Sequence, residues 1–83
     1  MISILLNKEK NGIDILLDKK GAELLIDDLQ YLKDSNDHVH LAEWSGELTS
    51  LKLLHDDSTV ISFLNIGVLA DSKIKEIYDN SVE

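Results

Sequence analysis

The stretch from Asp37 to Thr49 concentrates the side chains that could do chemistry. It contains His38, His40 and Trp44, which are two of the three histidines and the only tryptophan. Successive side chains of a β-strand point to opposite faces, so a strand from His38 to Trp44 would place both imidazoles and the indole on one face. These groups make apolar contacts and also hydrogen-bond. We expect this face to be the functional surface.

His38 and His40 have the spacing of two metal ligands, because residues i and i+2 of a strand project from the same face. A metal site needs three or four protein ligands. The third would have to be His55, at the end of a neighbouring predicted strand, or Glu43, which lies on the opposite face of its own strand. A small metal-binding or metal-sensing domain is therefore an alternative, and we expect no metal and no other cofactor.

Acidic residues surround the tryptophan in the sequence. Glu43 and Glu47 flank Trp44, and Asp56 and Asp57 form a further acidic pair. Binding hot spots favour tryptophan, and carboxylates around it would suit a cationic protein surface. The alternatives are an indole packed in a minor core and carboxylates that are simply solvated. The expected partner-binding residues are His38, His40, Glu43, Trp44, Glu47, Asp56 and Asp57.

The residue types do not suggest an enzyme. No Ser-His-Asp arrangement and no glycine-rich phosphate loop can be placed, and the absence of cysteine excludes a thiol nucleophile and thiolate metal ligands. A chain with one sheet and one long helix has little room for a cleft between two catalytic carboxylates. We expect no catalytic residues; acid–base work by the histidines is the enzymatic alternative.

The N-terminal segment predicts a β-hairpin. Ile2–Leu6 is a short apolar run, and apolar residues alternate in Ile13–Leu17. Asn11-Gly12 is a strong signal for a two-residue turn, because both turn positions require positive φ. Such a turn would place Leu6 opposite Leu17.

A helical period follows from Lys19 to about Lys33, with Asp18 as the expected N-cap. Gly21 is expected to allow close packing on the sheet. Asp28 lies nearer the apolar stripe than the polar side of the helix, so it is either an ordinary carboxylate at the rim or one placed where the helix meets the sheet. The residues of the apolar stripe are Ala22, Leu25, Leu29 and Leu32.

Three further strands are predicted, at His38–Trp44, Leu48–Leu54 and Thr59–Ile66, before a short helix at Asp71–Asn80. The last strand is apolar on both faces and should be central in the sheet. The fold class is α+β: an N-terminal β-hairpin, one long amphipathic helix packed on a mostly antiparallel sheet of about five strands, and a short C-terminal helix. The other sheet face, covered only in part, is expected to be an interface with a partner or a second copy.

The bulk properties limit the partners. The 83 residues fit a single domain, 1–83, and the formal net charge of −8 opposes binding to nucleic acid or to an anionic membrane. A basic protein would be attracted. We see no signal peptide and no apolar run long enough to span a bilayer, so we expect a cytoplasmic protein.

The residues His38-Val39-His40-Leu41, followed by Trp44-Ser45-Gly46-Glu47-Leu48-Thr49, resemble a motif of small bacterial immunity proteins from polymorphic toxin systems, immunity protein family thirty-two. The helix that begins Gly21-Ala22-Glu23-Leu24-Leu25 is also similar to that family. The resemblance extends from Gly21 to Thr49, with weaker agreement in Val60–Ile66. It implies an α+β protein that binds and neutralises a cognate toxin, often a nuclease.

The resemblance does not by itself identify contact residues, and the roles of His38, His40 and Trp44 follow from the strand geometry. An acidic chain fits a basic nuclease domain, since nucleases that bind phosphates tend to be basic. We therefore expect an immunity protein that holds a cognate toxin domain by direct protein–protein contact. The alternatives are the metal-binding domain and a structural homodimer that meets itself through the Trp44 face.

Overall fold

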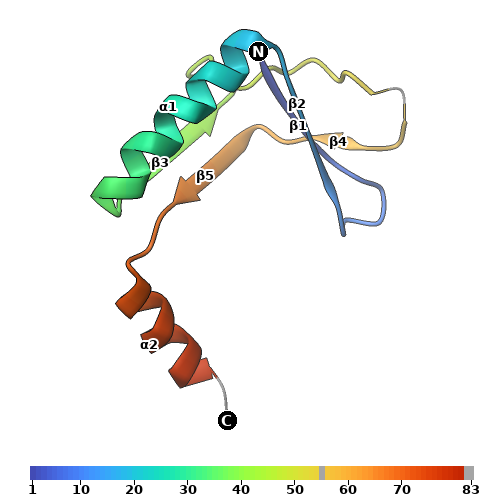
Figure 1. Ribbon diagram of the computed structural model, residues 1–83. Coiled ribbons are helices and arrows are strands. Elements are labelled where there is room, and N and C mark those ends of the chain that lie inside the picture. Colours follow the sequence, from blue (N-terminus) through green and yellow to red (C-terminus); the bar gives the residue numbers. More distant parts are fainter. Residues whose placement is uncertain (55, 82–83) are drawn as a thin grey trace.

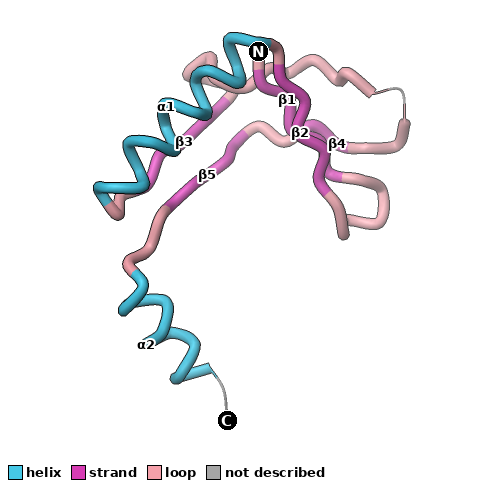
Figure 2. Tube along the Cα trace, in the orientation of Figure 1, coloured by secondary structure: helices cyan, strands magenta, loops and turns pink. Residues whose placement is uncertain are grey.

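The computed structural model describes residues 1–54 and 56–81, and it contains two helices and two small antiparallel sheets (Figure 1; Figure 2). The strands are β1 (Ile2–Leu6), β2 (Ile13–Leu17), β3 (His38–Ala42), β4 (Thr59–Val60) and β5 (Phe63–Gly67). The helices are α1 (Lys19–Ser35) and α2 (Asp71–Ser81). The α+β class is confirmed, and the predicted tail helix is confirmed with one additional residue, Ser81.

The strands form two sheets instead of the single predicted one. The first has the order β2-β1-β4, and the second pairs β3 with β5. The prediction of one central strand over Thr59–Ile66 is wrong, because this segment breaks between its two sheets. The Ile61 N–H donates to the Ile4 carbonyl at 2.8 Å, while the carbonyl of Ser62 accepts from the Glu43 N–H at 2.9 Å.

The predicted strand Leu48–Leu54 is also wrong. Leu48 makes a single parallel bridge to Ile2, and the Thr49 N–H donates to the Ile2 carbonyl at 2.9 Å. The chain then continues as a loop, in which the Leu51 carbonyl accepts a hydrogen bond from the Ser3 hydroxyl at 3.4 Å. The edge of β1 is shared between this short contact and β4, which leaves no edge for a longer ladder.

The hairpin is confirmed, but its predicted register is wrong. Leu6 pairs with Ile13, and Ile2 pairs with Leu17, so the connection runs from Asn7 to Gly12. The Asn7 side chain shapes this loop: its Oδ1 accepts the Asn11 N–H at 3.0 Å and the Gly12 N–H at 3.3 Å. The positive φ belongs to Lys10, at 60°, and not to Asn11-Gly12.

Helix α1 begins and ends with identifiable caps. The Asp18 side chain accepts the Gly21 N–H at 2.8 Å, which confirms the predicted N-cap. The helix extends to Ser35, and Asn36 ends it in the left-handed conformation with φ 52°. Gly21 is required by packing, because a Cβ there would lie 2.2 Å from the Met1 carbonyl oxygen.

The core lies between α1 and the inner faces of both sheets. Ile2 and Ile4 of β1 pack with Leu41 of β3 and with Leu48, and half-buried leucines of α1 complete the cluster. Helix α2 contains no buried residue and extends from the end of β5 as a separate arm (Figure 1).

Neither helix in the described part of the chain is long and apolar enough to cross a membrane.

Candidate functional site

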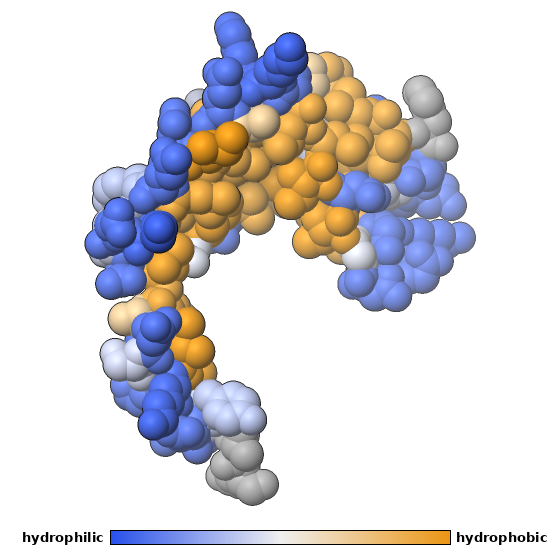
Figure 3. Space-filling model, in the orientation of Figure 1, coloured by the Kyte–Doolittle hydropathy of each residue, from blue (hydrophilic) through white to orange (hydrophobic). Residues whose placement is uncertain are grey.

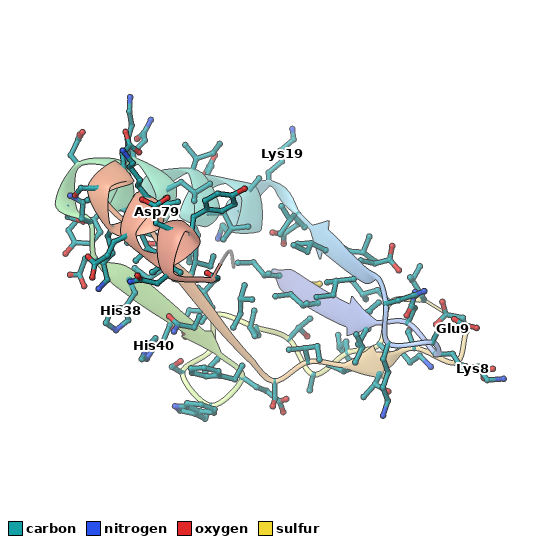
Figure 4. All side chains as sticks on the ribbon, turned by 90° about the horizontal axis from the view of Figure 1, so that it is seen from below. Lys8, Glu9, Lys19, His38, His40 and Asp79 are labelled. Atoms are coloured by element: carbon teal, nitrogen blue, oxygen red, sulfur yellow. The ribbon has the colours of Figure 1, made fainter. Side chains whose placement is uncertain are left out.

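Strand β3 places the two histidines on one exposed face. It pairs antiparallel with β5, so that Val39 faces Ile66 and Leu41 faces Leu64 on the side packed against α1. His38 and His40 therefore project from the opposite side, where both are exposed. Figure 4 shows the two imidazoles pointing away from the helices. This shared face is as the sequence predicts.

The histidines are part of a longer row of rings. The centroids of the His38 and His40 rings lie 4.9 Å apart, and the Phe63 ring meets the His40 ring edge-on at 5.3 Å. The Trp44 ring stacks on the Phe63 ring at 5.6 Å with an interplanar angle of 6°. All three separations lie in the range of favourable ring pairs. We call His38, His40, Phe63 and Trp44 the aromatic strip.

Trp44 reaches the strip from a turn, not from the predicted strand, because β3 ends at Ala42. The Gly46 N–H donates to the Glu43 carbonyl at 3.1 Å and closes the turn, and Gly46 has φ 88°, which favours glycine. The indole lies at the tip of this turn with 76% of the residue exposed. It still shares a surface with the histidines, because its ring folds back onto Phe63.

Asp37 anchors the histidine end of the strip. One carboxylate oxygen, Oδ1, accepts the His38 N–H at 2.8 Å and lies 3.3 Å from His38 Nδ1. The other, Oδ2, accepts the Tyr31 hydroxyl at 2.9 Å. The hydrogen bond from the His38 N–H, and then the one from the Tyr31 hydroxyl, lower the pKa of Asp37. The hydrogen bond between Tyr31 and Asp37, and then the charge of Asp37, raise the pKa of Tyr31. The strip therefore carries a fixed negative charge at this end.

Glu43 and Glu47, the two predicted acidic residues that flank Trp44, lie in different surroundings. Glu43 is exposed in the turn beside Trp44, but Glu47 is half-buried on the side toward α1. Glu47 Oε2 is buried and has no hydrogen-bond partner among the described residues. Burial, then the charges of Asp27 and Glu47, raise the pKa of Asp28, which places the Glu47 carboxylate near α1 and away from the strip.

Asp56 and Asp57 lie at the opposite end of the molecule, beside the β1–β2 loop. Asp57 Oδ2 is 3.7 Å from Lys8 Nζ, and Figure 4 shows Lys8 at the far end from His38 and His40. Asp56 is engaged within its own turn, where the Ser58 hydroxyl and the Ser58 N–H lower the pKa of Asp56. The structure thus brings together His38, His40, Glu43 and Trp44 but not Glu47, Asp56 and Asp57.

The described residues 1–54 and 56–81 contain no group of three histidine, aspartate, glutamate or cysteine side chains that could hold a metal ion. The histidine pair alone is two ligands short of a tetrahedral site. The predicted third ligand, His55, lies outside the described residues. No pocket opens among the described residues either.

Three members of the site are missing from the sequence-based set: Phe63, Asp37 and Tyr31. Phe63 lies opposite Ala42 across the β3–β5 ladder, and periodicity within one strand does not specify which residue of another strand will face it. The sequence features that could have indicated Phe63 are that it is the only phenylalanine and that its predicted strand has apolar residues on both faces. Tyr31 and Asp37 are six residues apart, across a helix end, and carry no comparable signal.

The sequence matches no protein-family model, and neither a curated protein nor a solved structure is significantly similar to it.

Proposed function

We propose that this chain is an immunity protein that binds and neutralises a cognate bacterial toxin domain through its aromatic strip. The exposure of the strip carries the proposal. Trp44 is 76% exposed and Phe63 is 41% exposed, although both are large rings in mutual contact. Burying stacked aromatic groups removes much apolar surface from water, and such groups dominate interface energetics. The resemblance of the motif around Trp44 supports a toxin as the partner.

The charge of the strip and of the whole chain favours a basic partner. Glu43 and Asp37 lie at its two ends, and among the described residues neither carboxylate forms an ion pair with a lysine. The net charge of −8 adds a long-range attraction for a cationic domain. We infer that the toxin presents basic side chains around an apolar pocket or platform, as a nuclease domain would.

The first experiment identifies the toxin. Affinity capture at low ionic strength is run in parallel with the wild-type chain and with Trp44→Ala. A basic toxin domain retained only by the wild type, and released as salt is raised, supports the proposal. The captured domain is then expressed with and without the wild-type chain, which should restore the growth of cells that the domain otherwise kills.

The second experiment measures the strip itself by calorimetry with the purified toxin domain. Trp44→Ala and Phe63→Ala should each weaken binding by about 2 kcal/mol, which is roughly a 30-fold higher Kd. Trp44→Phe should lose less, because it retains a ring that can stack on Phe63. Ile26→Ala is the matched control: it removes an exposed apolar side chain from α1, at a distance from the strip.

Two charge-reversal variants test whether acidic side chains beside the aromatic strip contribute to binding. Glu43→Lys should slow association and flatten its salt dependence, because a rim charge acts mainly on the association rate. Glu23→Lys makes the same change on the solvated side of α1 and should leave the association rate within a small factor. Equal affinity of the wild type and Trp44→Ala for the toxin would reject the strip as the binding site.

A further inference from the structure

The chain has more surface than a compact monomer of its size. Its accessible area is 6263 Å², whereas a folded monomer of 9.3 kDa is expected to expose about 5000 Å². Its radius of gyration is 15.2 Å, against about 12 Å for a compact domain of this length. The excess of about 1300 Å² is larger than the roughly 800 Å² that each partner buries in a standard interface.

Helix α2 is one source of this excess. Ile74, Ile77 and Tyr78 lie on one stripe of the helix, and each is about half exposed or more. The helix has only 11 residues and buries none of them. An isolated helix of fewer than about 12–15 residues is marginal in water, so the stability of α2 requires something against which its stripe can pack.

The inner face of β2 is the other source. Ile13, Ile15 and Leu17 pair with Leu6, Ile4 and Ile2, so their side chains lie on the same face of the sheet as the buried core. Helix α1 covers the β1 side of that face and leaves β2 open, where Ile13 is 59% exposed and Ile15 is 51% exposed. Figure 3 shows the hydrophobic residues gathered along the inner side of the curve, from the hairpin to the arm formed by α2.

Helix α2 does not cover β2 of its own chain. The Val68 N–H donates to the Asp37 carbonyl at 3.1 Å, which tethers the start of the arm at the C-terminal end of α1. Strand β2 joins the N-terminal end of α1, and a helix of 17 residues is about 26 Å long. The arm therefore begins at the opposite end of α1 from the point where β2 ends, and the exposed face of β2 is open to an occupant from another molecule.

We propose that the occupant is α2 of a second copy of this chain, and that two copies exchange their arms reciprocally. The sizes agree: α2 is about 16 Å long, and the three open side chains of β2 span about 13 Å. A two-fold axis makes the same contact twice, and the apolar stripe and the apolar strand face are both present in every copy. The aromatic strip points away from α1 and stays free for a different partner (Figure 4).

Sedimentation velocity of the full chain tests the exchange. The wild type should sediment as a dimer of two 9.3 kDa chains, and more completely at high salt, because two copies of charge −8 repel each other. Ile77→Asp and Ile15→Asp should each weaken the dimer by at least tenfold. Ser72→Asp adds the same charge on the opposite side of α2 and should leave the dimer intact. Trp44→Ala should also leave it intact, which separates this inference from the binding proposal.

A mixture of the two disruptive variants gives the sharper result. Ile15→Asp chains retain an intact α2, and Ile77→Asp chains retain an intact β2 face, so the mixture should form a dimer with one sound contact although neither variant dimerises alone. Amide hydrogen exchange in residues 71–81 should slow as protein concentration rises. A wild type that stays monomeric at every concentration and salt, or a dimer that neither substitution weakens, would overturn the proposal.

Discussion

Asp28 is an unusual carboxylate for the surface of a helix. It is half-buried on α1, and burial is the main reason that its pKa is raised. The charges of Asp27 and Glu47 raise the pKa of Asp28 further. Glu47 contributes a buried oxygen with no hydrogen-bond partner among the described residues. Repulsion between the ionised carboxylates of Asp28 and Glu47 therefore lowers the free energy of unfolding.

Asp28→Asn should stabilise the protein at neutral pH. The pKa of Asp28 is higher in the folded chain than its ordinary value of 3.8, so the folded state binds the proton more strongly than the unfolded state. The wild type therefore loses stability as pH rises from the unfolded pKa of Asp28 to its folded pKa. The advantage of the variant should grow as pH rises above about 4 and level off once Asp28 is ionised in the folded chain. Urea unfolding across this range measures the difference.

Glu47→Gln provides the control for this explanation. If repulsion between the two carboxylates matters, each single variant is more stable than the wild type and the double variant gains less than the sum. Independent, fully additive effects would mean that burial and the charge of Asp27, without Glu47, raise the pKa of Asp28. A destabilised Asp28→Asn would contradict the argument.

The site residues illustrate what a single sequence can specify. The period of a strand was sufficient to place His38 and His40 together, because it depends only on local geometry. The Trp44–Phe63 stack depends on the register between β3 and β5 and on a turn that redirects the indole. Such contacts are set by tertiary structure, so the sequence predicted that the two imidazoles share a face but not that Phe63 and Trp44 extend the row of rings.

At the level of elements, local signals predicted α1 and α2 well and the strands less well. The hairpin loop shows the reason. Asn11-Gly12 has the composition of a tight turn, but Asn7 binds the N–H groups of both residues and thereby makes the longer loop the better solution. The break at Ile61-Ser62 likewise follows from two sheets competing for one apolar segment, which alternation within the segment does not reveal.

Gly21 connects α1 to the first sheet, and Gly21→Ala should destabilise the protein. Alanine is favoured over glycine in a helix by about 1 kcal/mol, but its Cβ would lie 2.2 Å from the Met1 carbonyl oxygen and 3.0 Å from the Ile2 side chain. Backbone at β1 must shift to relieve the first overlap. We expect a net loss of about 1–3 kcal/mol in the free energy of unfolding.

Ala22→Gly is the natural comparison, because it changes the next helical residue in the opposite sense. It should cost about 1 kcal/mol through helix propensity alone, plus a contribution from the lost half-buried methyl group. Chemical denaturation of both variants separates the two mechanisms. Gly21→Ala as stable as the wild type would mean that moving β1 away from α1 costs only about the 1 kcal/mol that alanine gains in helix propensity.

For the whole molecule, the division into two sheets has a larger consequence than the loss of one strand. A single sheet would have left one uncovered face. Two sheets joined at an angle leave an open inner curve, which bears β2 and α2, and an outer face, which bears the aromatic strip. The exposed apolar surface is therefore divided in two, and we propose self-association for the inner curve and a basic partner for the aromatic strip.

Added salt should strengthen dimer formation through the inner curve and weaken toxin binding through the aromatic strip. The chain has 16 acidic and 8 basic residues, so added salt screens repulsion between copies and also screens attraction to a basic domain.

Thermal unfolding measures the effect of salt on the dimer. If folding is coupled to dimerisation, each tenfold rise in protein concentration adds about 0.7 kcal/mol per chain and raises Tm by about 3–6 °C. The concentration dependence should be steepest where the dimer is saturated at high salt, whereas toxin binding should be tightest at low salt. A Tm independent of concentration under both conditions would mean that the folded chain is stable without its second copy.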